Sequence, residues 1–155
     1  NGGSTSRLEW VEMIWQNAGF SAQAFADIHQ LIWEKFICNV MCSAPCAAFE
    51  CTIGELFADQ DRRKVALGCL IEAYQIGIAK GIHFSFDDVV AYGSKFAELM
   101  PNANPSMRLD HFAGKKSEID AINGIVPVLG KELGIATPHN DKVVALVRAK
   151  EAAFE

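Results

Sequence analysis

A long apolar segment decides the fold of this chain: residues 22–42 read AQAFADIHQLIWEKFICNVMC. At 3.6 residues per turn, its apolar side chains lie nearly all the way around the helix, and a helix of that kind is buried. Pro45 follows shortly afterwards and is expected to kink or restart the helix, because proline lacks the N–H that continues the hydrogen-bond ladder. We therefore expect a buried helix over about 22–42.

Helical patterns also account for most of the remaining sequence. Apolar residues three and four positions apart fill the helices, and glycines or capping residues mark their ends. The expected helices are 7–18, 59–80, 85–100 with Ser85 as its cap, 118–133, and one from Pro138 to the C-terminus, with a connector over 52–58. No convincing strand pattern is present. The predicted fold class is therefore all-α, a bundle of about six to eight helices.

The composition is that of a globular chain of one domain. Of its 155 residues, 50% are hydrophobic and 21% are charged, which suits a soluble protein with a core rather than a disordered chain. A net charge of −5 and the lack of a basic run argue against a nucleic-acid partner. No charge-free run is longer than Phe36 to Phe49, which is too short to span a membrane, so no membrane partner is expected.

Cysteines and histidines give no sign of a metal site. The five cysteines at 38, 42, 46, 51 and 69 lie in apolar sequence without a Cys-x-x-Cys pair. We expect free buried thiols in a reducing cytosol, and hence a cytoplasmic protein. The four histidines have no metal-ligand spacing, and no Gly-rich phosphate motif is present. We therefore expect no metal and no phosphate cradle in this chain.

A polar stretch, residues 104–124, reads NPSMRLDHFAGKKSEIDAING and suits a loop that opens a helix and holds a small polar ligand. Ser106 presents a hydroxyl in that loop, and Glu118 falls in the first turn of the expected helix. Each also has a simpler explanation. Ser106 can be a turn residue after Pro105, and Glu118 can complement the positive end of the helix.

Lys35 and Asn39 are a second polar pair, placed four residues apart in the apolar segment, and therefore one turn apart on one helix face. Because no other charge follows before Phe49, we expect the Lys35 ammonium to be partly desolvated and suited to act as a general acid. Asn39 would orient it or bind substrate. The alternative is that Lys35 reaches solvent and Asn39 caps a buried backbone group.

Taken together, these residues resemble the C-terminal domain of the ketopantoate reductase (2-dehydropantoate 2-reductase) family, a helical domain like that of 6-phosphogluconate dehydrogenase-like reductases. The resemblance runs from about Ser4 to the end of the chain. The matching positions are Trp33, Lys35, Asn39, Gly54-Glu55-Leu56, Ser106-Met107, Asp110, Ser117-Glu118-Ile119-Asp120, Asn123-Gly124, Gly134-Ile135, Thr137-Pro138 and Asn140.

The resemblance implies the helical half of an NADPH-dependent reductase whose Rossmann domain precedes this chain. Residues 1–6 would be the tail of that domain or a linker, and residues 7–155 the helical domain. Lys35 would be the catalytic proton donor, supported by Asn39, and Ser106 would bind substrate. Glu118 would be catalytic as well, and it is the one residue of this chain with an expected role near the cofactor. The isolated domain would be inactive.

Two positions depart from the family pattern, and they leave the substrate open. Ser43 and Ile53 stand where family members typically carry asparagines, so Ser43 would take over a substrate contact and another 2-oxo acid could be bound. One alternative is a related dehydrogenase acting on such an acid or an imine. Another is a non-catalytic dimerisation module. For a homodimer, helices 7–18 and 61–80 would form the interface, unless they pack on each other.

Overall fold

The computed structural model describes residues 3–25 and 27–154, and within them the chain forms eight helices and no strand. The predicted all-α class is therefore confirmed. The helices are α1 (Ser6–Asn17), α2 (Ile28–Phe49), α3 (Ile53–Ala58), α4 (Gln60–Ala79), α5 (Val89–Leu99), α6 (Ser106–Phe112), α7 (Ile125–Leu133) and α8 (Pro138–Glu151). None of these helices is long and apolar enough to cross a membrane.

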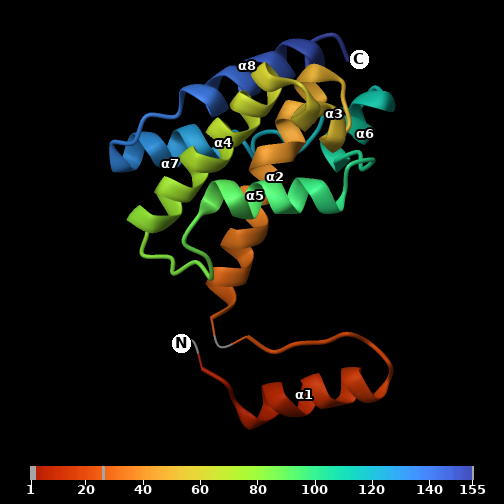
Figure 1. The fold of residues 1–155 in the computed structure, drawn as a ribbon, viewed down its shortest axis with the longest axis vertical. Helices are drawn as coiled ribbons and strands as arrows, with labels where there is room; N and C mark the ends of the chain where they lie inside the picture. The colour runs from red at the N-terminus through yellow and green to blue at the C-terminus, as the bar shows by residue number, and fades with distance from the viewer. Residues whose placement is uncertain (1–2, 26, 155) are drawn as a thin grey trace.

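Helix α2 is the axis of the fold. It packs against α4 above all, and also against α6, α8, α3 and α5, which surround its second half (Figure 1). Nearly every residue of α2 from Ile37 to Ala47 is buried, and Leu70 and Ile76 of α4 join them in one core. We call residues 27–154 the helical body. Its core explains why the second half of α2 is apolar on all sides, because that half is enclosed by its neighbours, whereas Ile28, Leu31 and Ile32 in the first half are exposed.

Helix α2 begins and ends later than predicted. Asp27 caps it by accepting a hydrogen bond from the His29 N–H, whereas residues 22–25 are not helical. Pro45 lies inside the helix without ending it, so the expected restart is wrong. Packing of this buried turn outweighs the hydrogen bond that proline cannot make. The helix ends at Phe49, and Glu50 directly after it has a left-handed backbone with a φ of 54°.

Two further boundaries differ from the sequence prediction. The expected connector at 52–58 is helix α3, because Thr52 and Glu55 form a capping box whose side chains each accept from the other's backbone N–H. Helix α5 is capped by Asp88 rather than Ser85, since the Asp88 carboxylate accepts from two backbone N–H groups in the first turn.

The polar stretch also folds differently from the expectation. It contains a helix of its own, α6, which begins at Ser106. Residues 113–124 then form bends and turns, and α7 begins only at Ile125. The Glu118 carbonyl accepts from the N–H groups of Ala121 and Ile122, so one helix-like turn precedes α7 without joining it. Glu118 therefore lies in a turn, not in a helix.

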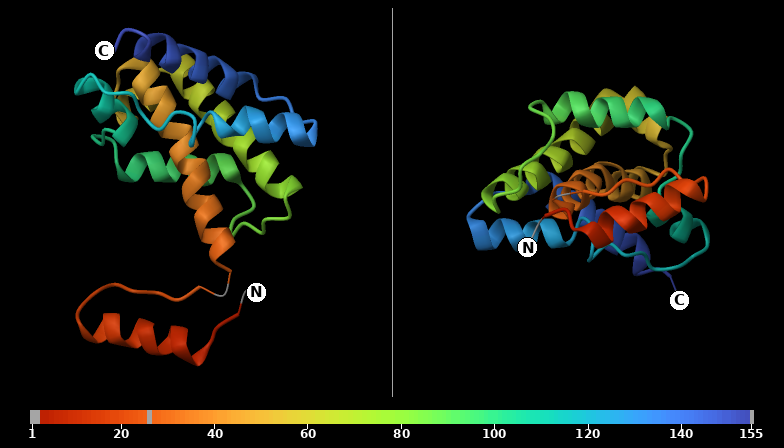
Figure 2. Two further views of the ribbon diagram at one scale, coloured as in Figure 1. Left: turned by 180° about the vertical axis from the view of Figure 1, so that it is seen from behind. Right: turned by 90° about the horizontal axis from the view of Figure 1, so that it is seen from below.

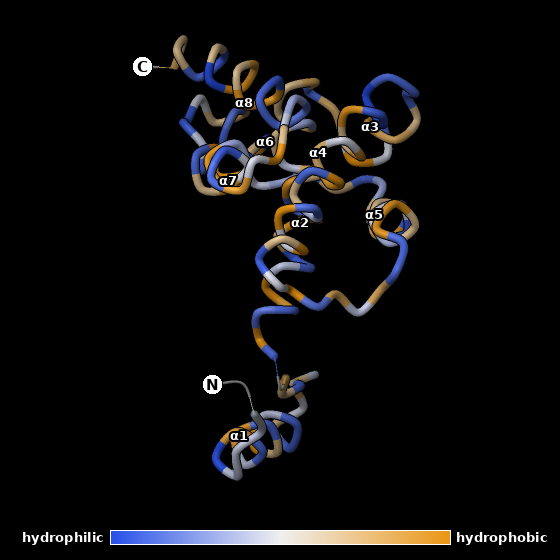
Figure 3. The backbone as a smooth tube through the Cα atoms, turned by 90° about the vertical axis from the view of Figure 1, so that its left-hand side faces the viewer, coloured by the Kyte–Doolittle hydropathy of each residue, from blue (hydrophilic) through white to orange (hydrophobic). Residues whose placement is uncertain are grey.

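The N-terminal part of the chain stands apart from the helical body. Helix α1 ends as predicted before Gly19, whose φ is 87°, and residues 20–25 then run back along α1 (Figures 1 and 2). We call residues 6–25 the arm. No residue of α1 is buried, so α1 does not pack on α4. Apolar stretches of α1 are visible in Figure 3 with no other helix of the chain beside them.

Candidate functional site

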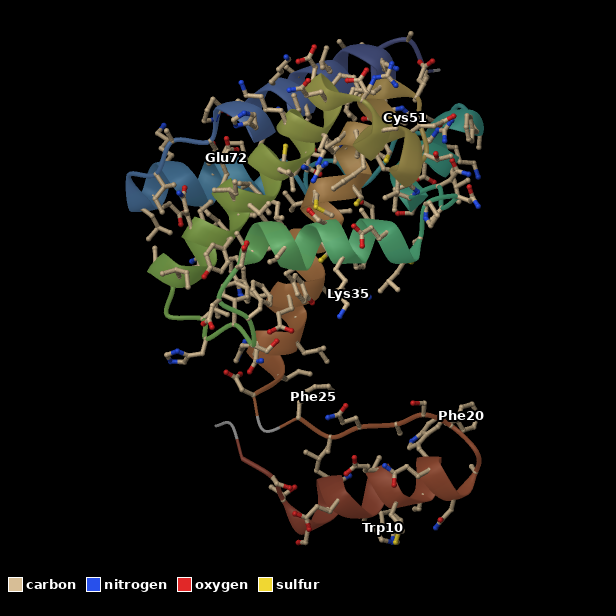
Figure 4. All side chains as sticks on the ribbon, in the orientation of Figure 1. Trp10, Phe20, Phe25, Lys35, Cys51 and Glu72 are labelled. Atoms are coloured by element: carbon tan, nitrogen blue, oxygen red, sulfur yellow. The ribbon has the colours of Figure 1, made fainter. Side chains whose placement is uncertain are left out.

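One face of α2 carries the polar residues that the sequence analysis singled out. Lys35, Asn39 and Ser43 follow one another at intervals of four and lie on that face. Lys35 is exposed, Asn39 is half-buried, and Ser43 is 4% exposed within the core. In Figure 4 the Lys35 side chain projects from α2 on the side of the molecule where the arm lies. The face therefore runs from solvent into the interior.

The exposure of Lys35 corrects one expectation, since in this chain the ammonium is not desolvated. The neighbours on its face are nevertheless apolar. Ile32, one turn before the lysine, is 54% exposed, and Ile28, two turns before it, is 50% exposed. Large aliphatic side chains beside a single lysine make a surface that would shield the ammonium once another body covered it.

Ser106 and Glu118 lie on other elements, with exposed side chains. Ser106 is the first residue of α6, which packs against α2. Each is held by a buried neighbour, Met107 at 1% exposure beside Ser106 and Ile119 at 3% beside Glu118. Both neighbours belong to the same core as α2. Their backbones are therefore fixed at the edge of the body while their side chains remain free to contact a ligand.

The loop before Ser106 is tied to the start of α3. The N–H of Ile53 donates to the Ala103 carbonyl over 3.2 Å, and the N–H of Gly54 donates to the Pro101 carbonyl over 2.7 Å. Glycine is required there, because a Cβ at position 54 would lie 2.8 Å from the Pro101 oxygen. The Ile53 side chain is 3% exposed and belongs to the core.

A buried network of amides and one carboxylate holds the body together beside Asn39. Asn123 donates to the Val40 carbonyl over 2.8 Å and to Asn140 Oδ1 over 3.0 Å. Asn140 in turn donates to Glu72 over 2.7 Å, and Glu72 also accepts from the His139 N–H. Asn123 therefore belongs to the interior and not to a ligand loop.

Sequence reasoning missed Glu72, which is 5% exposed in the middle of α4. A single acid in the apolar stripe of a helix was the available signal. Glu72 accepts from both the His139 and Asn140 N–H groups at the start of α8, so it acts as the N-terminal cap that Thr137 does not provide.

Another carboxylate, Glu151 at the end of α8, holds the polar stretch, residues 104–124, in place through hydrogen bonds. It accepts from the Ser117 backbone over 2.8 Å and from the Ser117 hydroxyl, and its oxygen lies 3.2 Å from His111 Nε2. Burial raises the pKa of Glu151, but these hydrogen bonds outweigh it and leave the pKa below its usual range. This contact fixes the backbone directly before Glu118.

All five cysteines are free and buried, as predicted. Cys51 differs from the others. Its hydrogen bond with Cys46 lowers its pKa to about 7, burial opposes that shift, and Arg62 assists it. Within residues 3–25 and 27–154, no group of three His, Cys, Asp or Glu side chains is arranged to hold a metal ion.

None of the prominent hollows found in residues 3–25 and 27–154 is lined by Lys35, Asn39, Ser106 or Glu118. These hollows are lined by other side chains. One of them, with a volume of about 680 Å³, lies between Leu67 and its neighbours on α4 and His139 of α8. Lys35, Ser106 and Glu118 are exposed on three different elements, and Asn39 is half-buried. A ligand bound by these residues would need a second protein surface to enclose it.

Comparisons with known proteins agree on one family. The family model described as "Ketopantoate reductase PanE/ApbA C terminal" matches residues 27–151. A 2-dehydropantoate 2-reductase of Streptococcus pyogenes is 36% identical over 124 residues, which are 79% of this chain and 40% of the relative. The chain thus spans less than half the length of that curated relative.

Solved structures agree with this. The PanE/ApbA family ketopantoate reductase of Ralstonia eutropha is 30% identical with a TM-score of 0.87, covering 97% of this chain and 50% of that one. A D-mandelate dehydrogenase solved with NADH and anilino(oxo)acetate is 25% identical with a TM-score of 0.86, covering 99% of this chain and 64% of that one. This chain belongs to the ketopantoate reductase C-terminal domain family.

Proposed function

We propose that this chain is the substrate-binding half of an NADP-dependent 2-dehydropantoate 2-reductase, which reduces ketopantoate to pantoate in the cytoplasm for pantothenate and coenzyme A synthesis. The observation that carries the proposal is the α2 face on which Lys35 and Asn39 stand one turn apart, within the stretch that the family model matches. The other half is a nucleotide-binding domain, consistent with relatives that are about twice as long.

The cofactor, when bound, supplies the hydride that the ketone carbon of the substrate accepts. The described helices offer no strand–glycine turn–helix for a dinucleotide pyrophosphate, so the residues of this chain fit the substrate rather than the cofactor phosphates. Lys35 Nζ donates a proton to the ketone oxygen as negative charge develops there, and Asn39 holds the lysine and the substrate. Ser106 binds the substrate, and Glu118 positions its hydroxyl and Lys35.

The test is turnover by the product of the complete reading frame, followed as NADPH oxidation with ketopantoate. Lys35→Ala is expected to lower kcat/KM by roughly 10²–10⁴-fold, the usual contribution of a general acid. Lys35→Arg should stay slow, because a guanidinium does not release its proton. Lys80→Ala, at the exposed end of α4, is the matched control and should keep full activity. Unchanged turnover in Lys35→Ala would contradict the assignment.

A second candidate function is reduction of another 2-oxo acid. It is favoured by Ser43 and Ile53, which offer no amide to the substrate, and by the similarity to a D-mandelate dehydrogenase solved with NADH. Substrate profiling with 2-oxo acids that lack the terminal hydroxyl, using NADPH and NADH in parallel, separates the two candidates. A preference for ketopantoate with NADPH supports the first. Absence of turnover with every acid would favour the non-catalytic dimerisation module.

A further inference from the structure

The C-terminal end of α2 brings two cysteines together. The Cys51 N–H donates to the Cys46 carbonyl over 3.2 Å, and Glu50, directly before Cys51, has a left-handed backbone. A left-handed residue after a helix, followed by a hydrogen bond from the next N–H back to the last turn, is the Schellman motif. The side chains of the two residues joined by that bond commonly contact each other. The backbone therefore places the Cys46 and Cys51 thiols side by side.

The two thiols lie in the same part of the core but differ in their tendency to ionise. Cys46 is 0% exposed and Cys51 is 2% exposed. A hydrogen bond between them raises the pKa of Cys46 and lowers the pKa of Cys51 to about 7. Cys46 is therefore the donor, and the Cys51 thiolate is the acceptor. Burial, by contrast, raises the pKa of Cys38 and of Cys42 to about 12. Cys51 is thus a thiol that ionises near neutral pH.

Two arginines stabilise the negative charge on Cys51. Arg62 of α4 donates a hydrogen bond to the thiolate, and the charge of Arg108 on α6 favours it further. The Arg62 side chain is 40% exposed and lines a hollow of about 530 Å³ beside Phe49, whose ring centre lies 5.8 Å from Arg62 Cζ. One flexible side chain therefore connects the buried thiol to an open hollow. A small oxidant reaches Cys51 when Arg62 moves aside.

The cysteine pair lies away from the candidate site. Figure 4 shows Cys51 at the end of the helical body far from the arm, whereas Lys35 lies nearer to the arm. Thr52, the next residue, caps α3, and the Ile53 N–H donates to the loop before Ser106. The pair therefore lies at the junction between α2 and the segment that holds the Ser106 loop.

We propose that Cys46 and Cys51 are a peroxide-sensitive dithiol, in which Cys51 is oxidised first and Cys46 then closes a disulfide within the chain. The Cys51 thiolate attacks one oxygen of hydrogen peroxide, the O–O bond breaks, and the released hydroxide leaves as water with the proton that Cys51 had lost. Cys51 is then a sulfenic acid. The Cys46 sulfur attacks the Cys51 sulfur, the S–O bond breaks, and hydroxide leaves as water with the Cys46 proton. Two thiols and one peroxide thus give one disulfide and two waters.

The first step prepares the second. The hydrogen bond to the Cys51 thiolate is the main cause of the raised pKa of Cys46. Once Cys51 is a sulfenic acid, that thiolate is gone, and Cys46 gives up its proton more readily. A small thiol such as dithiothreitol reverses the disulfide by exchange. The dithiol uses no residue of the candidate site, so it does not depend on the proposed reductase function.

Peptide mapping of the 155-residue chain tests the proposal. The chain is treated with hydrogen peroxide at neutral pH, the remaining thiols are alkylated, and cleavage after Glu50 separates Cys51 from the cysteines of α2. We expect the two peptides to stay joined by a disulfide that dithiothreitol breaks. Cys51 is also expected to react at least about tenfold faster than Cys69, which is fully buried and has a raised pKa. A Cys51 that stays reduced, or that links to a second chain, would overturn the proposal.

Two matched variants identify the partner of Cys51. Cys46→Ser is expected to abolish the linkage and to leave Cys51 as a sulfenic acid that dimedone traps. Cys42→Ser removes a buried thiol one turn earlier in the same helix, and as the control it should keep the linkage. Circular dichroism checks that both variants fold, and Cys46→Ala replaces Cys46→Ser if serine is not accommodated. Fragmentation of the linked peptides from the parent chain locates the bond independently. A linkage that survives the loss of Cys46, or that disappears with Cys42, would contradict the assignment.

Discussion

The helical body and the arm contain the same kinds of side chain and use them in opposite ways. In the body, Ile37 of α2 is 0% exposed and enclosed by the surrounding helices. In the arm, Ile14 of α1 is 42% exposed and α1 buries no residue at all. The body therefore has its partners within the chain, whereas the arm does not. Apolar content alone did not distinguish them; the number of helices around each one did.

The sharpest test of that difference is one substitution made in both regions. Ile37→Ala is expected to lower the free energy of unfolding of the 155-residue chain by about 4 kcal/mol, because it opens a cavity in the core. Ile14→Ala should change it by less than about 0.5 kcal/mol, because an exposed side chain leaves no cavity. Urea denaturation measures both. A similar loss for the two variants would show that the arm is packed within this chain.

The contribution of the buried polar network to the stability of the body can be tested by a separate substitution. Glu72→Ala removes the acceptor of two backbone N–H groups and of the Asn140 amide, and it should cost about 3 kcal/mol of unfolding free energy. Glu132→Ala, on the exposed side of α7, is the control and should cost almost nothing. Equal unfolding midpoints for the two variants would contradict the role of Glu72 as the cap of α8.

The close contact between α3 and the loop before Ser106 is expected to contribute less to the free energy of unfolding than Glu72 does, but by a measurable amount. Gly54→Ala places a methyl group 2.8 Å from the Pro101 oxygen and should cost about 2 kcal/mol, since backbone atoms must move. Gly3→Ala, with nothing within 4 Å of its Cβ, serves as the control. In the longer protein Gly54→Ala should also raise KM, because the loop carries Ser106. An unchanged unfolding midpoint would disprove the close contact.

The smallest expected effect is a pH dependence carried by Glu151. Its pKa in the folded chain lies below the usual glutamate value of about 4.3, so its stabilising effect is full above that pH and is lost as the pH falls through the folded pKa. Glu151→Gln should therefore be less stable than the parent at neutral pH and lose less stability between about pH 5 and about pH 3. Parallel stability curves for the two proteins would contradict this.

Much of the body followed from sequence patterns, and the exceptions have physical causes. Helix α4 and the end of α1 were predicted correctly, because glycine and capping residues mark them. The prediction for α2 erred at both ends, since local patterns could not show that residues 22–25 turn back on α1 or that packing keeps Pro45 helical.

The candidate site could be predicted only as a set of residues. The interval between Lys35 and Asn39 gave their shared face, but their exposure depends on what covers α2. Asn123 looked like part of a ligand loop because its partners, Val40 and Asn140, lie far away in the sequence. Glu72 was missed for the same reason. Contacts between distant segments determine whether a polar residue serves the site or the interior.

The gradient of exposure along α2 has an evolutionary consequence. At Lys35 a new side chain meets open space, so natural selection can vary the chemistry there with little effect on folding. At Ser43, only 4% exposed, each larger side chain must displace neighbours in a close-packed core. If substrate preference is set at position 43, its divergence is therefore constrained by packing, and a change of substrate would require compensating substitutions among the helices around it.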